Sequence, residues 1–309
     1  MSRKGKAFCP GGITSFFEIC DLDSNGQPLS DEERIGARGG GFVIDKGVST
    51  EVSVEEANDV QIRVLINNKV RSDADTTLTV VNAILEKTSD TYQVTVKHKV
   101  EVPIGSGFGS SGAGALGTAL ALCKALKLNL SHNQIGQIAH VAEVRCKTGL
   151  GTVSGEILGG VILTMEPGAP GHGCIDRIPF PSELRIITAT YKPILTKNVL
   201  SSPEKKKLIN QWGKKILDNV IADPSLENFM LESKKFALNA GFMTNRVQKL
   251  IELAETNGAV GATQNMIGEA VHALVAEDRI DDVVQAFKKV ISSEKIITAK
   301  IDLKGARLL

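Results

Sequence analysis

The chain has 309 residues, of which 42% are hydrophobic and 23% are charged, and its formal net charge is +1. This length is enough for two domains with buried cores. The balanced charge disfavours a general nucleic-acid or membrane-surface binder, which needs a basic excess, and no apolar run reaches the roughly 18 residues of a membrane-spanning helix.

The first part of the chain alternates between strand-like and helix-like patterns. Strands are predicted over residues 41–48, 60–66, 92–102 and 158–165. A helix is predicted over 72–87, with apolar residues at helical spacing and Ser72 or Asp73 as its N-cap. A further helix begins at Ser131, where Gln134 completes a capping box.

The second part follows a stretch of prolines and glycines, 167–173, which cannot continue a helix. We therefore expect one domain at 1–178 and another at 179–309. Strands are predicted in the second domain at 184–190 and 295–301, and helices at 203–216, 226–239, 244–256, 266–275 and 281–292. A glycine-rich turn at 257–263 precedes the predicted helix 266–275.

The cysteines and the N-terminus predict a cytoplasmic protein. The chain has five cysteines, an odd number, scattered without a Cys-x-x-Cys pair, which is typical of reduced thiols. Residues 1–8 lack the apolar segment of a signal peptide. We expect a small-molecule substrate and neither nucleic acid nor membrane as a partner, and we leave open whether the protein is a monomer or a homodimer.

The most informative segment is the glycine-rich loop 103–114, which follows the predicted strand 92–102 and leads into a helix of small residues. Such a loop exposes backbone N–H groups and the positive end of a helix dipole, which together bind phosphate. No Asp or Glu occurs between Glu101 and Glu143, so a bound anion would meet no carboxylate nearby in the sequence.

Two common phosphate loops fit this segment poorly. A P-loop needs a lysine after its last glycine, and Gly112 is followed by alanine and glycine. Gly107, Gly109 and Gly112 match a dinucleotide fingerprint literally, but the acidic residue expected roughly 20 positions later is missing. An ordinary glycine-rich connection is the remaining alternative, although so many glycines are costly to order without a use for the exposed backbone.

The pattern Pro-x-x-x-Gly-Phe-Gly-Ser-Ser-Gly in this loop resembles the ATP loop of the GHMP kinases, the superfamily of galactokinase, homoserine kinase, mevalonate kinase and phosphomevalonate kinase. Segments 8–17 and 258–262 resemble, in the right order, the superfamily's first motif and its late glycine turn. The resemblance implies an α+β fold with an N-terminal domain like domain 2 of ribosomal protein S5 and a ferredoxin-like C-terminal domain. It also implies ATP and Mg²⁺ as cofactors.

Within the superfamily, the chain is most similar to the archaeal pantoate kinase group. The shared segments are 13–17, 36–41, 148–153, 159–164 and 167–171. Four positions depart from the group: Gly12 stands in place of His, Ala37 of Ser, Thr152 of Asp and Thr164 of Arg. These positions are expected to face the acceptor, whereas the ATP side is intact.

The departures favour an altered acceptor. We expect an ATP-dependent kinase acting on an alcohol of an anionic hydroxy acid. The loss of a carboxylate would relieve the repulsion of an acceptor that carries its own phosphate, so mevalonate 3-phosphate, the substrate of a 5-kinase in isoprenoid synthesis, is the preferred acceptor. Pantoate, in coenzyme A synthesis, is the alternative. A catalytically silent nucleotide- or RNA-binding homologue is disfavoured because only 4% of the residues are aromatic.

The resemblance also assigns residues to the site. The ATP-binding candidates are Pro103, Gly105, Gly107, Phe108, Gly109, Ser110, Ser111, Gly112 and Ala113. Ser111 and Glu143 match the family's Mg²⁺ ligands; Ser111 could instead cap the following helix, and Glu143 could instead form a surface pair with Lys147. The substrate candidates are Gly12, Thr14, Arg38, His140 and Thr164.

The catalytic candidates are Ser111, Glu143, Lys147 and Thr152. Lys147 could screen the transferring phosphate. The family's Asp would act as a general base, and Thr152 in its place cannot accept a proton at neutral pH. Glu156, four residues later, is the candidate substitute.

Overall fold

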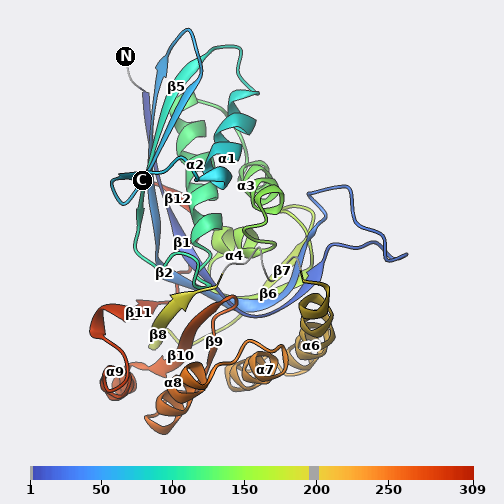
Figure 1. The fold of residues 1–309 in the computed structure, drawn as a ribbon, viewed down its shortest axis with the longest axis vertical. Helices are drawn as coiled ribbons and strands as arrows, with labels where there is room; N and C mark the ends of the chain where they lie inside the picture. The colour runs from blue at the N-terminus through green and yellow to red at the C-terminus, as the bar shows by residue number, and fades with distance from the viewer. Residues whose placement is uncertain (1–2, 195–201) are drawn as a thin grey trace.

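The structure, a computed structural model, describes residues 3–194 and 202–309. Two long strands, β1 (Arg3–Cys20) and β2 (Gly36–Glu56), form an antiparallel pair that runs through the first sheet (Figure 1). The register of the pair shifts after Pro10 and again after Thr14, because extra residues interrupt the ladder there. These irregularities lie beside the glycines of both strands and shape one wall of the site described below.

The remaining strands extend the first sheet to both sides of this pair. The order across the sheet is β12-β1-β2-β5-β3-β4, while β6 pairs with the beginning of β2 and then with β7. The β3–β5 pair is parallel and the other pairs are antiparallel. The bounds are β3 (Gln61–Ile66), β4 (Lys69–Val70), β5 (Tyr92–Val100), β6 (Val161–Glu166), β7 (Cys174–Ile178) and β12 (Arg307–Leu308).

Four helices cover one face of this sheet, and α2 lies directly on β1 and β2 (Figure 1). A Cβ atom on Gly5 would come within 2.0 Å of the carbonyl oxygen of Ala121, and one on Gly117 within 2.5 Å of Thr50 Oγ1. The small residues of α2 are therefore required by the close approach of helix and sheet. The bounds are α1 (Asp75–Leu85), α2 (Ser110–Leu126), α3 (His132–Cys146) and α4 (Thr152–Leu158).

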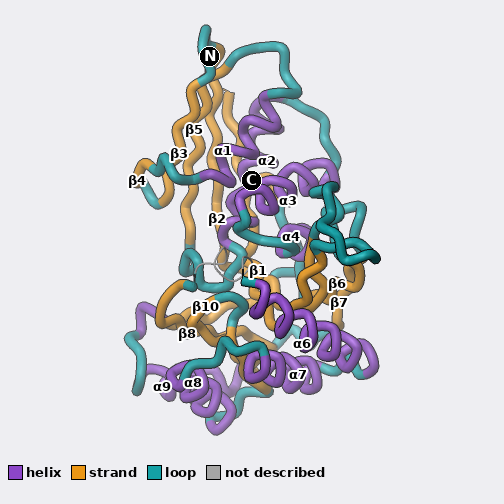
Figure 2. Tube along the Cα trace, turned by 45° about the vertical axis from the view of Figure 1, so that its right-hand side comes forward, coloured by secondary structure: helices purple, strands orange, loops and turns teal. Residues whose placement is uncertain are grey.

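The second sheet is antiparallel, with strand order β11-β8-β10-β9. Helices α8 and α9 pack against this sheet and α7 packs against its edge strand β9, while α6 packs against α7 and β1 (Figures 1 and 2). The strands are β8 (Leu184–Pro193), β9 (Gly261–Gln264), β10 (Gly268–Ala276) and β11 (Ile296–Lys300). The helices are α6 (Pro203–Ala222), α7 (Leu226–Asn239), α8 (Asn245–Thr256) and α9 (Ile280–Lys288), with 3₁₀ turns at Glu277–Arg279 and Ser293–Lys295.

The two sheets share a continuous apolar core at their junction. Phe229 of α7 lies between Phe16 of β1 and Phe42 of β2, with ring centroids 5.6 Å and 5.3 Å apart. All three side chains are buried, and aromatic pairs at this separation stabilise beyond their buried area. The junction is therefore a packed interface, which holds the site residues of both parts in fixed positions.

The end of the chain returns to the first sheet. Ile301 forms a bridge with Ile44, the N–H of Asp302 donates to the carbonyl of Val43 at 2.8 Å, and β12 pairs with β1. The predicted boundary near 178 falls between β7 and β8. The last residues of the predicted C-terminal domain, 179–309, nevertheless pair with strands of the first sheet. A short returning strand has no composition signal, so the sequence pattern did not indicate it.

Several predicted elements are found with small changes of bounds. Helix α7 has the predicted bounds, and α3 begins with the predicted capping box of Ser131 and Gln134. The predicted N-cap of α1 is wrong, because Ala74 occupies that position without a side-chain hydrogen bond.

The predicted helix at 266–275 is also wrong, because these residues form the turn after β9 and then strand β10. Nearly every residue of β10 is buried, so its mostly apolar sequence lacks the alternation of a half-buried strand, and periodicity cannot distinguish it from a buried helix.

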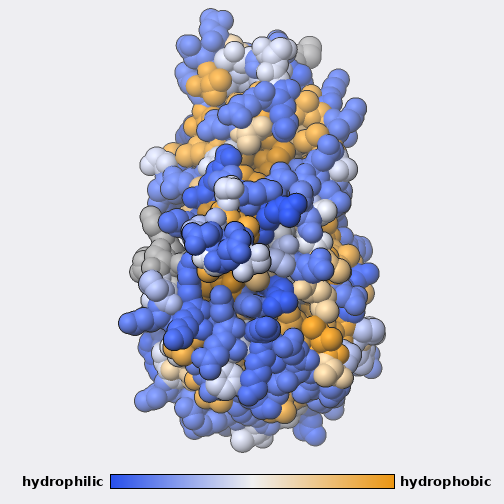
Figure 3. Space-filling model, turned by 90° about the vertical axis from the view of Figure 1, so that its right-hand side faces the viewer, coloured by the Kyte–Doolittle hydropathy of each residue, from blue (hydrophilic) through white to orange (hydrophobic). Residues whose placement is uncertain are grey.

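Hydrophilic residues predominate on the face shown in Figure 3, with hydrophobic residues in separate patches. Within the residues that the structure describes, none of the helices combines the length and the apolar character needed to cross a membrane.

Candidate active site

A cavity of about 550 Å³ lies where the glycine-rich loop meets both sheets. Its walls come from the bulged parts of β1 and β2, the first turn of α1, the loop before α2, the segment from the end of α3 into α4, and the turn between β9 and β10. Segments that are far apart in the sequence therefore converge on one space. A cavity of this size matches the usual volume of small-molecule sites.

The loop before α2 adopts a backbone that only glycine accommodates well. Gly105, Gly107 and Gly109 have φ angles of +71°, +77° and +62°. A Cβ atom would lie 2.9 Å from Asn265 Cβ at Gly107, and 2.3 Å from Glu156 Oε1 at Gly109. No side chain caps α2, so the N–H groups of its first turn remain available to a ligand. The loop has the features of a phosphate site.

Most of the predicted ATP-binding residues lie along this cavity. Gly105, Gly107, Phe108, Gly109, Ser110 and Ser111 line it. Pro103, Gly112 and Ala113 do not, and the N–H of Ala113 donates to the carbonyl of Gly109 at 2.9 Å within the helix. For Ala113, the structure therefore corrects the expectation of a free N–H group.

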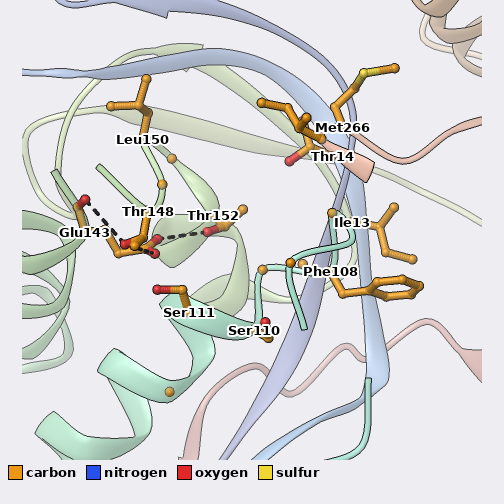
Figure 4. Close-up of a pocket in the computed structure, with 18 of the residues that line it drawn as sticks. Ile13, Thr14, Phe108, Ser110, Ser111, Glu143, Thr148, Leu150, Thr152 and Met266 are labelled. Carbon is orange, nitrogen blue, oxygen red and sulfur yellow. Dashed lines mark hydrogen bonds between the residues drawn. The ribbon is translucent and has the colours of Figure 1, made fainter. Parts of the chain in front are cut away.

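Glu143 is the centre of a cluster of hydroxyl groups at the start of α2 (Figure 4). The carboxylate is 1% exposed; Thr148 Oγ1 donates to Oε1 at 3.1 Å and Thr152 Oγ1 to Oε2 at 3.3 Å. Thr76 joins Ser111 to Thr148 through contacts of 3.4 Å and 3.1 Å between hydroxyl oxygens. Burial raises the pKa of Glu143, while the hydroxyls of Ser111, Thr148 and Thr152 oppose that rise.

This geometry decides between two interpretations of Glu143. The alternative surface pair with Lys147 is absent, because Glu143 is buried and Lys147 is exposed at the C-cap of α3. Lys147 itself lines the cavity, as does Thr152. The predicted catalytic residues Ser111, Glu143, Lys147 and Thr152 therefore come together around one space.

Glu156 does not line the cavity, although it is close to it. Its side chain is 0% exposed, and neither carboxylate oxygen has a hydrogen-bond partner among the described residues. Burial raises the pKa of Glu156 well above its usual value, and the negative charge of Glu143 adds to the rise. The backbone N–H of Gly12 lies near enough to oppose the rise, although it does not reach hydrogen-bonding geometry with either oxygen. Because a base must reach the acceptor hydroxyl, the geometry does not support Glu156 as the substitute base.

Four of the five predicted acceptor-binding residues lie along the cavity. Gly12, Thr14, Arg38 and Thr164 line the cavity. The guanidinium of Arg38 is half-buried and already binds Glu18, with Nε 2.9 Å from Oε2. An acceptor anion would therefore compete with Glu18 for this cation.

His140 is a correction to the sequence analysis, which expected it to face the cleft. Its side chain is 1% exposed and lies outside the cavity lining, with Nε2 2.8 Å from the carbonyl oxygen of Ile35. Burial lowers the pKa of His140, so the ring is neutral and its N–H donates to that carbonyl. His140 lies one helical turn before Glu143 on α3, but only Glu143 of the two lines the cavity.

Some residues of the site escaped the sequence analysis. Thr76 carries no motif of its own, and Thr148 entered only as the first residue of the shared segment 148–153. The fold brings Thr148 to Glu143 and Thr76 to Thr148. The late glycine turn 258–262 does not line the cavity; Met266 and Ile267, a few residues later, do. The contact of Asn265 with Gly107 explains this difference, because the turn after β9 is the part that meets the phosphate loop.

A buried hydrogen-bond network holds that turn in place. The Nδ1–H of His272, in β10, donates to Asn265 Oδ1 at 2.9 Å, and its Nε2 accepts from the hydroxyl of Ser15 at 2.8 Å. All three side chains are 0% exposed, and burial lowers the pKa of His272 to about 3. The network joins β1 to the turn that contacts Gly107.

Comparison with known proteins identifies the family. Residues 75–160 match the family described as GHMP kinases N terminal domain. Pantoate kinase of Methanocaldococcus jannaschii is 31% identical, with 92% of this chain and 97% of that protein covered, and pantoate kinase of Thermococcus kodakarensis is 30% identical, with 91% and 90% covered. A solved structure named as a phosphotransferase related to the CoA biosynthesis pathway superposes with a TM-score of 0.88 at 26% identity, covering 99% of this chain and 98% of that one. The chain belongs to the GHMP kinases and is a phosphotransferase with the mixed α/β fold of that family.

Proposed function

We propose that this protein transfers the terminal phosphoryl group of ATP to a hydroxyl group of a small hydroxy acid, with Mg²⁺ bound at Glu143 and Ser111. The observation that carries the proposal is the common cavity. It is lined both by the uncapped N-terminus of α2, with its left-handed glycines, and by a buried carboxylate surrounded by hydroxyls.

The residues present fit both cofactors. The bare glycines leave space that any side chain at Gly107 or Gly109 would fill, and the first turn of α2 offers free N–H groups to phosphate oxygens. Glu143 and Ser111 offer the carboxylate and hydroxyl oxygens that suit Mg²⁺, which keeps several waters and phosphate oxygens as further ligands. When bound, ATP supplies the transferable phosphoryl group and Mg²⁺ neutralises its charge.

The side chains of this site align the reacting groups and neutralise charge, and they do not form bonds to the transferred phosphoryl group. Phosphoryl transfer passes through a loose transition state, so catalysis depends on alignment and charge neutralisation. Thr152 donates its hydroxyl hydrogen to Glu143, so it orients that carboxylate and does not remove a proton from the acceptor. Lys147, at the rim, is placed to screen the charge on the transferring group.

Pantoate is the acceptor that the comparisons favour. Relatives named pantoate kinase match almost the whole chain at 31% and 30% identity. This favours the alternative of the sequence analysis over its preference for mevalonate 3-phosphate. One observation keeps mevalonate 3-phosphate as the second candidate: Thr152 and Thr164, where the pantoate kinase group has Asp and Arg, both line the cavity. The acceptor side therefore lacks two charges of that group.

A coupled ADP-release assay with pantoate, mevalonate and mevalonate 3-phosphate tests the proposal. We expect turnover with pantoate that depends on both ATP and Mg²⁺. Turnover with mevalonate 3-phosphate alone would replace pantoate as the acceptor and leave the kinase mechanism intact. Failure to release ADP with any of the three, in a protein that also fails to bind ATP, would contradict the proposed function itself.

A further inference from the structure

Two buried carboxylates meet at the N-terminus of α2, and the proposed function uses only one of them. The position that a Cβ atom on Gly112 would occupy lies 2.9 Å from Glu143 Oε2, 2.9 Å from Thr152 Oγ1 and 3.0 Å from Glu156 Oε2. Three oxygens from α3 and α4 therefore converge on Gly112. They lie too close to it for any side chain there, so a glycine is required where the two carboxylates approach α2.

We propose that Glu156 is the second carboxylate of the divalent-cation site at Glu143. This inference rests on the proposed kinase function and deepens it. The side chain of Glu156 is 0% exposed and that of Glu143 is 1% exposed, and both Glu156 oxygens lack a hydrogen-bond partner among the described residues. Buried carboxylates are normally paired with a cation or bound to a metal.

No protein cation takes this role in the described part of the chain. Neither Glu143 nor Glu156 forms an ion pair there. Arg307 of the neighbouring β12 binds Asp302 at 3.1 Å, and Arg38, which lines the cavity, binds Glu18. The dipole of α2 supplies about half a positive charge, which cannot balance two carboxylates.

The oxygen atoms of Glu143, Thr152 and Glu156 determine which kind of cation this site suits. No group of three or more His, Cys, Asp or Glu side chains forms a metal cluster within residues 3–194 and 202–309, so a soft transition-metal site is not indicated. Two carboxylates with nearby hydroxyls suit a hard cation such as Mg²⁺ or Mn²⁺, whose remaining ligands are water and phosphate oxygens.

This assignment also explains the replacement of the family's Asp by Thr152. Thr152 begins α4 and Glu156 lies one helical turn later, so both can approach the same side of α2. Glu156 then restores on α4 the negative charge that position 152 lacks. It does so beneath the phosphate loop and not at the acceptor, which agrees with its absence from the cavity lining.

The test uses Glu156→Gln in the full-length protein, because glutamine has the shape of glutamate without its charge. Mn²⁺ binding is measured by electron paramagnetic resonance during titration with MnCl₂, in the presence of a non-hydrolysable ATP analogue. We expect the variant to bind Mn²⁺ about 10–100-fold more weakly than wild type, the usual cost of losing a carboxylate that supports a metal site. Affinity for the analogue without metal should not change.

Two further variants make the result decisive. Glu232→Gln, at another buried glutamate that binds Asn219 and Lys235 away from the site, controls for loss of a buried charge and should bind Mn²⁺ as wild type does. Thr152→Asp combined with Glu156→Gln returns a carboxylate to α4 and should bind Mn²⁺ more tightly than Glu156→Gln. If the single variant fails to fold, this double variant is compared with Thr152→Asp alone, which keeps Glu156 as well and should bind Mn²⁺ more tightly than the double variant.

The outcomes separate this inference from the proposed function. Wild-type Mn²⁺ affinity in a folded Glu156→Gln protein would overturn the inference and make Glu156 a neutral acid that only packs against Gly12 and Gly109. Equal Mn²⁺ affinity of Thr152→Asp with and without Glu156→Gln would overturn it as well. Failure of the wild-type protein to bind both Mn²⁺ and the analogue would instead refute the proposed function.

Discussion

Comparing Gly107→Ala with Gly241→Ala distinguishes an effect on ATP binding from an effect on the stability of the fold. Gly107 has a φ angle of +77°, and Gly241, at the end of α7, has a φ angle of +76° with nothing within 4 Å of an added Cβ. Alanine at either position costs roughly 1–2 kcal/mol of backbone strain. At Gly107, a Cβ would also lie 2.9 Å from Asn265 Cβ, and overpacking of this kind adds about 1–3 kcal/mol.

The two variants should differ more clearly in their affinity for ATP. If the substitution turns one backbone N–H away from the phosphates, a hydrogen bond to a charged group is lost, worth about 1.5–3 kcal/mol. ATP affinity should then fall by about tenfold or more. Gly241→Ala should lose only the roughly 1–2 kcal/mol of stability that backbone strain costs, and no ATP affinity, as measured by urea unfolding and by titration with ATP. Equal ATP affinity in Gly107→Ala and Gly241→Ala would refute the assignment of the loop to phosphate.

Three further predictions follow from the site. Glu143→Gln should lower kcat by about 100-fold or more at saturating ATP, because the charge that holds Mg²⁺ is lost; wild-type turnover would contradict the metal role. Arg38→Ala should raise the KM for the acceptor while leaving the KM for ATP unchanged, and the reverse pattern in steady-state kinetics would place Arg38 on the nucleotide side. Burial lowers the pKa of His98 from 6.5 to about 4, so the folded state keeps this ring neutral and its stabilising effect is complete above pH 6.5 and lost as the pH falls towards 4. His98→Gln should flatten the pH dependence of the free energy of unfolding in that window, and an unchanged slope in urea titrations would contradict this.

The sequence predicted what depends on local patterns. The capping box at Ser131, the bounds of α7 and the glycine-rich loop that leads into a helix of small residues all follow from rules that act over a few residues. The family resemblance then brought Ser111 and Glu143 together across many residues of sequence. Both line the same cavity, as that resemblance implies.

The parts that sequence reasoning missed depend on long-range packing. The strand β10 is buried on both faces, so its apolar run was taken for a helix. His140 lies on the same helix as Glu143, but only the position of Ile35 shows that its ring faces away from the cavity. The hydroxyl partners of Glu143 come from α4 and from the segment between α3 and α4, and Thr76 of α1 joins the cluster through Thr148. No spacing rule relates these positions.

A crystal structure with Mg²⁺ and a non-hydrolysable ATP analogue tests the central claim most directly. The account predicts that the terminal phosphates lie against the N–H groups of the first turn of α2, with the cation between them and Glu143. A nucleotide bound elsewhere, or a phosphate loop left bare at saturating analogue, would contradict it.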